Sequence, residues 1–212
     1  MYLSDREMEY AIKCGRLIVD PPTKIGPTSI DLHLDKVEQA RVWDIKKYED
    51  HNRSHGVPPF EIRVSSYHYG TMSKLYHMPV PPDGDGVKVF RRDRQIIVRP
   101  TGFMLWQTKE VVGTPKDEAD LILFVDGKST RTARTGVLVH FTAPTIHAGW
   151  AGQVTLEIGN FGPFDIVLQE DDVIAQITVA TISSIPKVSM EKAGSTTLGQ
   201  RNVGGNAGTQ NG

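Results

Sequence analysis

The feature that most limits the possible folds is a series of short apolar runs, separated by Gly, Pro and Asp, that follow one another without helical spacing. Strands in this arrangement are typical of a sandwich, a jelly roll or a barrel. The sequence therefore predicts a mainly β fold. The runs are SIDLHLD, QIIVRPTGFMLWQT, ADLILFVDG, GVLVHFTA, GQVTLEIGN, FDIVLQ and VIAQITVATI.

The N-terminus predicts one short helix that lies on a sheet. Ser4 and Glu7 form a capping box, in which each side chain can satisfy the other residue's backbone amide. The segment VDPP ends the helical pattern, so we expect the helix to run to about Arg16. The apolar residues at helical spacing are Met8, Ala11, Ile12 and Leu17.

The chain reads as a single domain over 1–188 followed by a flexible tail over 189–212. Its 212 residues, 39% of them hydrophobic, can build one substantial core. The segment 40–95 is irregular and predicts a long loop or an inserted hairpin. Small polar residues dominate the tail, which is a composition typical of a mobile segment and also of a lid that orders over a ligand.

Composition excludes several classes of protein. A net charge of -1 gives no general attraction to nucleic acid. Cys14 is the only cysteine, so one chain has neither a disulfide framework nor a cysteine-rich zinc site. The sequence has no signal peptide and no run long enough to span a bilayer. We therefore expect a cytoplasmic protein that binds no membrane.

Glu157 is the first candidate for chemistry. Val154, Leu156 and Ile158 share one face of the predicted strand, and Glu157 lies on the other. A solvent-facing residue is an equally good interpretation of this pattern alone. The preceding PTIHAGWAG is rich in turns and glycine, however, and such loops shape binding sites. If this face lines a pocket, Glu157 could act as a general acid and base.

The second candidate is VDGKSTRTARTG at 125–136, which places lysine, hydroxyls and arginines next to a glycine turn. Such groups can bind phosphate, although the order of a P-loop is absent. Taken alone, the stretch is more commonly a polar surface loop.

Other features point to packing or to loops. Two histidine pairs lack further ligands nearby, and HNRSHGVPP is a poor helix, so we interpret its histidines as loop residues. The two tryptophans are interpreted as packing residues. Zinc-dependent nucleobase deaminases need H-x-E and P-C-x-x-C, which one cysteine excludes. The residues concerned are His51 with His55, His140 with His147, and Trp106 with Trp150.

Taken together, five stretches resemble the deoxycytidine triphosphate deaminases, which share a superfamily with the trimeric deoxyuridine triphosphatases. They run in family order over most of the chain, apart from 40–95. The stretches are LSDREMEYAIKCGRL (3–17), PTSIDLHL (27–34), VDGKSTRTARTGVLVHFTA (125–143), IHAGWAGQVTLEIGN (146–160) and, loosely, TLGQ (197–200).

The resemblance implies a distorted jelly roll or β-barrel of the dUTPase-like type. It implies a homotrimer, or paired trimers, with active sites between subunits. The implied reaction is hydrolytic deamination of dCTP to dUTP and ammonia without zinc, and Mg²⁺ would accompany the phosphates of the nucleotide. The alternatives are pyrophosphate release from dUTP, alone or coupled to deamination, and a relative that binds nucleotide without turnover.

The resemblance also implies roles for single residues. Glu157 falls on the catalytic glutamate, which shuttles protons, and Arg134 falls on the arginine of the catalytic loop. Ala143 falls where a backbone group contacts the base. The loop is one residue longer than the common pattern, so its hydroxyl is Ser129 when counted from Gly127 and Thr130 when counted back from Arg134. We favour Ser129.

The remaining implied contacts surround the nucleotide. The residues expected on the triphosphate are Lys128, Ser129, Thr130 and Gln200. The others expected to contact the substrate are Thr142, His147, Trp150 and Gln176.

Two positions depart from the family pattern. His147 replaces an aspartate that contacts the sugar and, in the triphosphatases, orients the attacking water. Imidazole is a poor replacement for that carboxylate, which weakens the triphosphatase interpretation. In the tail, Thr196 and Thr197 replace Lys-Tyr, so phosphate contacts there would be looser or would use Lys192.

Overall fold

The structure is a computed structural model that describes residues 1–64, 69–140 and 142–188. Within these residues it consists mainly of short strands, with a few short helices between them. The helices are α1 (Asp5–Lys13), the 3₁₀ helix η1 (Val37–Gln39), α2 (Ile45–Ser54), α3 (Tyr69–Tyr76) and α4 (Ser129–Thr132). The strands are β1 (Ile18–Asp20), β2 (Ile30–His33), β3 (Arg41–Trp43), β4 (His77–Pro79), β5 (Val89–Arg92), β6 (Gln95–Val98), β7 (Phe103–Gly113), β8 (Leu121–Gly127), β9 (Val137–Val139), β10 (Thr145–Ile146), β11 (Ala151–Asn160), β12 (Ile166–Gln169) and β13 (Val173–Thr181).

Three antiparallel sheets enclose one core. The first has the order β4-β3-β7-β11-β9, with β1 also paired to β7; the second has the order β10-β8-β13-β2, and the third β12-β6-β5. Side chains from the first two sheets pack together between them, and Leu123, Trp106 and Leu156 are fully buried. Each strand of the seven predicted runs is present, so the predicted mainly β fold is confirmed.

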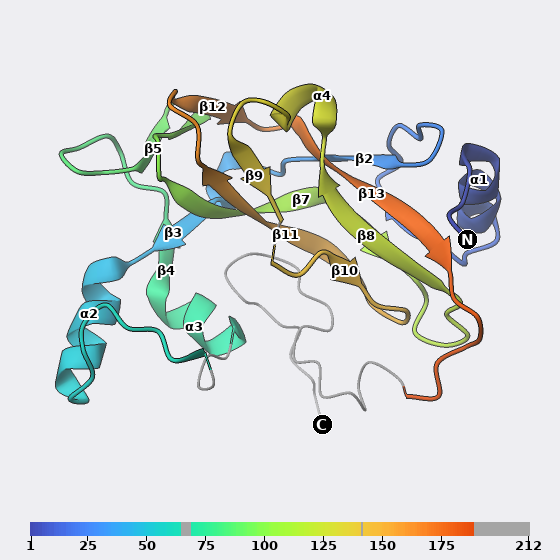
Figure 1. Cartoon of the computed structure of the whole chain (residues 1–212), viewed down its shortest axis with the longest axis horizontal. Helices are drawn as coiled ribbons and strands as arrows, with labels where there is room; N and C mark the ends of the chain where they lie inside the picture. Colours follow the sequence, from blue (N-terminus) through green and yellow to red (C-terminus); the bar gives the residue numbers. More distant parts are fainter. Residues whose placement is uncertain (65–68, 141, 189–212) are drawn as a thin grey trace.

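The predicted N-terminal helix is present and ends earlier than expected. Glu7 accepts the backbone amide of Ser4 at 2.9 Å, as the capping box predicts. The helix stops at Lys13, because Gly15 adopts a left-handed backbone with φ of 72°. Met8 and Ala11 are fully buried in the core, and α1 lies at one end of the molecule (Figure 1).

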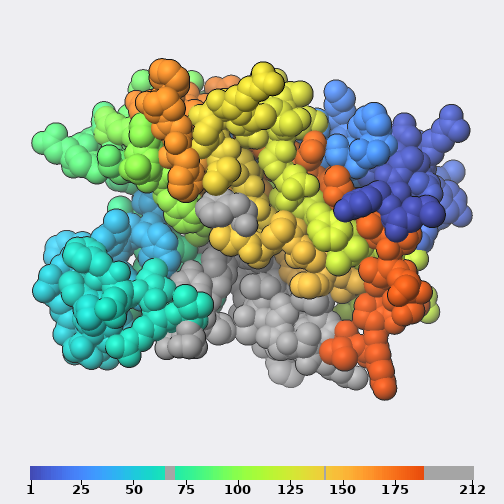
Figure 2. Space-filling model, in the orientation of Figure 1, coloured from blue at the N-terminus to red at the C-terminus, as the bar shows by residue number. Residues whose placement is uncertain are grey.

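The segment 40–95 differs from the predicted loop or hairpin. It forms β3, α2, α3, β4 and β5, and its two α-helices build a lobe at the opposite end from α1 (Figures 1 and 2). The periodicity of this segment is weak because its helices are short and α2 is mostly exposed, so they are held by tertiary packing rather than by a long apolar stripe.

His51 and His55 also differ from the prediction, which placed them in a loop. His51 lies in α2 and His55 caps its C-terminus, with 4.3 Å between the two ring centroids. Asp44 supports the start of this helix, because its side chain accepts the backbone amide of Lys47 at 3.0 Å. Tyr48 packs against Tyr76 of α3 at 5.0 Å, which stabilises the lobe.

No helix among the described residues is long and apolar enough to cross a membrane.

Candidate active site

Glu157 lies on β11, where the predicted alternation is observed. Leu156 and Ile158 are buried in the core, whereas Glu157 faces the other way and is partly exposed. The register fixes this orientation, since Leu156 pairs with the buried Trp106 of β7 and Glu157 pairs with Leu105. Because Leu156 and Ile158 are buried in the core, the alternation of the strand directs the Glu157 carboxylate to the opposite face of the sheet.

The segment after β9 holds the Glu157 carboxylate directly. The hydroxyl of Thr142 lies 2.6 Å from both carboxylate oxygens, and its amide donates to Oε2 at 3.2 Å. Sequence reasoning placed Thr142 among the substrate contacts, and in this structure it contacts the candidate catalytic carboxylate. A hydroxyl can donate one proton at a time, so these contacts fix the carboxylate but leave its other lone pairs available for water or substrate.

His140 shapes the turn that carries Thr142. Its backbone lies in the left-handed region with φ of 53°, and its amide donates to the carbonyl of Glu157 at 2.8 Å. Its ring nitrogens lie 3.1 Å from the Thr155 carbonyl and 2.8 Å from the Ala143 carbonyl. The ring thus ties the Ala143 backbone, the expected base contact, to the strand of Glu157. Sequence reasoning considered His140 only as a metal ligand and missed this role.

The segment 40–95 extends the sheet that carries Glu157. Across neighbouring strands, Pro79 of β4 is opposite Arg41 of β3, Arg41 is opposite Leu105 of β7, and Leu105 is opposite Glu157. Directly opposed residues point to the same face, so Arg41 and Glu157 share one face of the sheet. Burial lowers the pKa of Arg41.

The loop at 127–136 presents the other candidate catalytic residues to solvent. Ser129 and Thr130 form the first residues of α4, and both are exposed. Arg134 is exposed as well, with a left-handed φ of 71°. The structure places both candidate hydroxyls on one short helix and does not choose between them.

Two close backbone contacts fix the end of this loop. Gly136 has a φ of 84°, and a Cβ there would come within 2.3 Å of the Gly162 nitrogen. A Cβ on Gly162 would in turn come within 2.2 Å of the Thr135 carbonyl oxygen. Glycine at both positions lets the loop lie against the turn after β11. The exposed Arg134 therefore precedes the end of β9 that packs against Gly162.

Arg134 and Glu157 lie at opposite ends of β9 within one chain. At one end the Gly136 carbonyl accepts a hydrogen bond from the Phe161 amide, and at the other the His140 amide donates to the Glu157 carbonyl. These ends are separated along the strand by roughly 13 Å, at about 3.3 Å per residue. Within one chain, Glu157 and the backbone that leads to Arg134 are thus held at opposite ends of this strand.

Lys128, the N-cap of α4, and Gln176 of β13 both lie beside β2 of the second sheet. The Lys128 ammonium forms an ion pair with the carboxylate of Asp31 on β2. Gln176 of β13 lies opposite Asp31 in the register and accepts the Ser29 hydroxyl at 3.2 Å. Sequence reasoning missed Asp31, although a carboxylate within the apolar run SIDLHLD was the available signal.

The remaining predicted contacts are scattered around the loop before β11. Ala143 and His147 are exposed. Trp150 is buried, as is Trp106, and the interpretation of both as packing residues is confirmed. The Trp150 carbonyl accepts the Thr114 amide at 2.8 Å, so this loop is held by the end of β7. Gln200, Thr196, Thr197, Lys192 and the tail at 189–212 lie outside the described residues.

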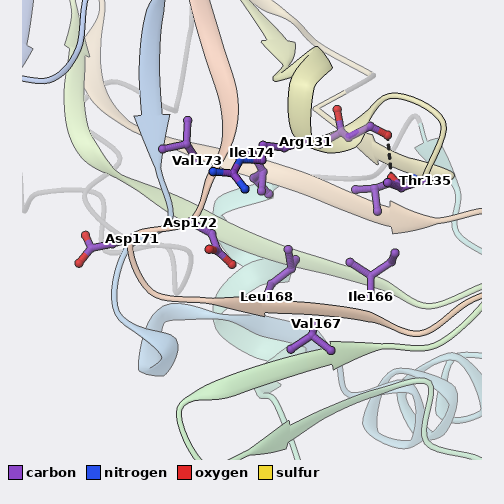
Figure 3. A pocket seen from close by; sticks show the side chains of 11 residues that line it. Arg131, Thr135, Ile166, Val167, Leu168, Asp171, Asp172, Val173 and Ile174 are labelled. Carbon is purple, nitrogen blue, oxygen red and sulfur yellow. Dashed lines mark hydrogen bonds between the residues drawn. The ribbon is translucent and has the colours of Figure 1, made fainter.

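Two pockets lie near these elements, and neither is lined by Glu157 or Arg134. One of about 300 Å³ lies behind α4, between it and the turn from β12 to β13, and includes Arg131 and Asp172 (Figure 3). The other, of about 940 Å³, lies where β3 and α2 meet β5 and β7, and includes Trp43. The predicted pocket around Glu157 is not one of these two cavities.

Across residues 1–64, 69–140 and 142–188, no group of three or more His, Cys, Asp or Glu residues is arranged to hold a metal ion.

Comparisons with known proteins agree with the resemblance seen in the sequence. The dCTP deaminase-like family model matches residues 2–182. A protein of Thermobifida fusca named dCTP deaminase, dUMP-forming, is 33% identical over 205 residues, which cover 95% of this chain and 89% of that protein. A protein of the same name from Acidothermus cellulolyticus is 32% identical over 186 residues, covering 87% of this chain and 82% of its own.

Among solved structures, the 2'-deoxycytidine 5'-triphosphate deaminase of Agrobacterium tumefaciens is similar, with a TM-score of 0.54 and 16% identity. The match covers 85% of this chain and 48% of that chain, so this protein spans about half the length of that structure. At this identity the likeness concerns the fold.

Proposed function

Because this chain belongs to the dCTP deaminase-like family, we propose that it hydrolyses the amino group of dCTP to give dUTP and ammonia. The observation that carries the proposal is the carboxylate of Glu157, held at 2.6 Å by the Thr142 hydroxyl beside the exposed Ala143 backbone. A fixed carboxylate next to a backbone that can contact a base is the arrangement that deamination without zinc requires.

In the proposed reaction, water adds to the carbon of cytosine that bears the amine. Glu157 accepts a proton from that water and delivers it to the departing nitrogen, so that dCTP and water become dUTP and ammonia. Thr142 keeps the carboxylate oriented during both transfers. Ser129, or Thr130 in its place, and Arg134 would stabilise the charge that develops on the ring.

The separation of Arg134 from Glu157 supports a site shared between subunits. We propose a homotrimer, or paired trimers, in which the 127–136 loop of one chain meets Glu157 of its neighbour. The triphosphate would carry Mg²⁺ as part of the substrate, where the ion would offset the charge of the phosphates. Free deoxynucleotides are the substrate, so we place the reaction in the cytoplasm.

The test is substitution of Glu157 by Gln, which keeps the size of the side chain but removes its ability to accept the proton. Ammonia release from dCTP with Mg²⁺ is expected to fall about 10²- to 10⁴-fold, while dCTP binding measured by calorimetry is retained. Glu9→Gln on the exposed surface of α1 is the matched control and should leave turnover unchanged. Full turnover by the Glu157 variant would remove this residue from the mechanism.

A second candidate is the coupled release of pyrophosphate, because the two relatives described above are named dUMP-forming. Against it stands His147, which replaces a carboxylate suited to orienting the attacking water. Following ammonia and pyrophosphate separately from the same dCTP reaction distinguishes the candidates. Ammonia alone supports the first proposal, equal amounts of both products support the second, and pyrophosphate alone excludes deamination. Binding of dCTP with neither product would indicate a relative that has lost turnover.

A further inference from the structure

Lys128 joins three elements at the base of the 127–136 loop. Its amide donates to the Ile174 carbonyl of β13 at 2.7 Å. Its carbonyl accepts the amides of Arg131 and Thr132 at 2.8 and 2.9 Å, which starts α4. Its ammonium pairs with Asp31 of β2. The residue just before Ser129 is thus fixed through both its backbone and its side chain.

The Asp31 carboxylate depends on this pair. Asp31 is 7% exposed and lies on β2, opposite Gln176 of β13. Within the described part of the chain, Lys128 is the one cation paired with it. A buried carboxylate that loses its only cation is left uncompensated, which is strongly unfavourable. Movement of the ammonium to a phosphate would create that situation.

In contrast to the anchored Lys128, the candidate catalytic residues that follow it in the loop are exposed to solvent. Ser129, Thr130 and Arg134 are all exposed, and no side-chain hydrogen bond or ion pair within the described chain holds them. The loop therefore has a fixed base and a tip that is free to contact a nucleotide. Phosphate can be bound at the tip without breaking the ion pair at the base.

We propose that Lys128 is a positioning residue, which neutralises Asp31 and holds the catalytic loop, and that it is not a ligand of the triphosphate. The inference rests on the proposed function for its substrate and corrects the role expected for Lys128 from family resemblance. In this role the ammonium acts through the position of Ser129 and Arg134. Its loss changes the rate of the chemical step more than the binding of phosphate.

The first test compares Lys128→Met and Asp31→Asn in steady-state deamination. Each is expected to lower kcat about tenfold or more, because small displacements of catalytic groups are costly, while the KM for dCTP changes less than about threefold. Lys128→Arg keeps a cation for Asp31 and should restore most of the turnover. A Lys128→Met variant with wild-type kcat and a raised KM would contradict the proposal.

The second test needs no turnover. The affinities for dCTP and for dCMP, which lacks the two outer phosphates, are measured by calorimetry in a Glu157→Gln background, so that dCTP is bound with little turnover. The wild-type ratio is then that of Glu157→Gln with Lys128 intact. A dCTP-to-dCMP affinity ratio within about threefold of the wild-type ratio in Lys128→Met supports the proposal, and a larger fall overturns it. If the single variant does not fold, the same ratio is measured in the double variant Asp31→Asn, Lys128→Met, which removes both charges.

Thermal unfolding of the two single variants and the double variant tests the pair without nucleotide. The double variant should melt no lower than the less stable single variant, because each single variant already breaks the pair. If the decreases in melting temperature of the two single variants add up in the double variant, the proposed pair between Lys128 and Asp31 is contradicted. A wild-type protein that binds dCTP but releases no ammonia would refute the proposed function, while the affinity ratio and the unfolding cycle would still decide the role of Lys128.

Discussion

At the scale of single residues, the contact between Thr142 and Glu157 is the most informative part of the site. A hydroxyl at 2.6 Å from both carboxylate oxygens is a short, charge-assisted hydrogen bond. It limits the rotation of the carboxylate. The bond therefore serves the proton-accepting step more directly than it serves the fold.

Thr142→Val is expected to slow deamination about 10- to 100-fold, since hydrogen bonds to charged groups contribute roughly 1.5–3 kcal/mol. The backbone amide contact and the β-branched shape both remain, and residue 142 is exposed, so the melting temperature should change little. Ammonia release by the purified variant provides the measurement. Thr142→Ser keeps the hydroxyl and is the control; equal losses in both variants would assign the effect to shape rather than to the hydrogen bond.

At the scale of elements, β3 and β4 add a partly buried histidine to the sheet of Glu157. His77 lies opposite Trp43 in the register, and their rings meet edge to face at 4.6 Å. Burial, reinforced by the charge of Arg41, lowers the pKa of His77 to about 4. The folded state therefore holds this ring neutral at pH values where the unfolded chain, with a pKa near 6.5, binds a proton.

Stability should fall as the pH drops from about 6.5 to about 4, because only the unfolded state takes up the proton in this window. Across this window His77 lowers the free energy of unfolding by up to about 3 kcal/mol. Above and below the window, its effect on stability does not change with pH. Urea unfolding at several pH values measures it. His77→Phe keeps an aromatic ring against Trp43 and should flatten this part of the profile; an unchanged profile would assign the pH dependence to other groups.

The turn after β11 gives a second prediction at this scale. Gly162→Ala would press a Cβ against the Thr135 carbonyl, where the available distance is 2.2 Å. The resulting strain is expected to destabilise the fold by about 1–3 kcal/mol and to displace the loop of Arg134. Melting temperature and ammonia release should both fall. Gly84→Ala is the control, since its Cβ would lie 3.5 Å from the Val87 side chain; normal turnover in Gly162→Ala would uncouple this turn from the site.

The elements also show what the sequence could predict. In the strands of the two main sheets, apolar residues either alternate with polar ones or form a continuous run. Sequence reasoning finds both patterns, because burial of one face imposes the alternation and burial of both faces gives the continuous run. The segment 40–95 was misjudged because α2 and α3 are short, α2 exposes most of its residues, and mutual contacts such as that of Tyr48 with Tyr76 stabilise the two helices. Local pattern carries little information about such a lobe.

At the scale of the whole molecule, the proposed sharing of the site between subunits follows from the position of β9. Glu157 and Thr142 gather at one end of this strand and Arg134 at the other. The sequence predicted the residue types of the site through family resemblance, but not that Lys128 would be engaged by Asp31. That pairing joins segments far apart in the chain, and spacing along the sequence does not report such contacts.

Mixing two inactive proteins tests the proposed sharing. Arg134→Ala and Glu157→Gln each remove one half of every site, so neither protein alone should release ammonia. After subunit exchange, some sites would combine an intact Arg134 with an intact Glu157, and part of the activity should return. Exchange is followed with a fluorescent label on one variant. Confirmed exchange without any recovery would place both residues of each site in the same subunit.

The three-residue strand between Arg134 and Glu157 also bears on how such an assembly must close. On the proposed arrangement every chain offers a donor surface and an acceptor surface that are different from each other, so the contact is head to tail and only a closed ring uses all of them. An open string of subunits would leave one donor and one acceptor idle at its ends. Specific activity should then collapse on dilution more steeply than the protein concentration itself, making subunit abundance a control on catalysis.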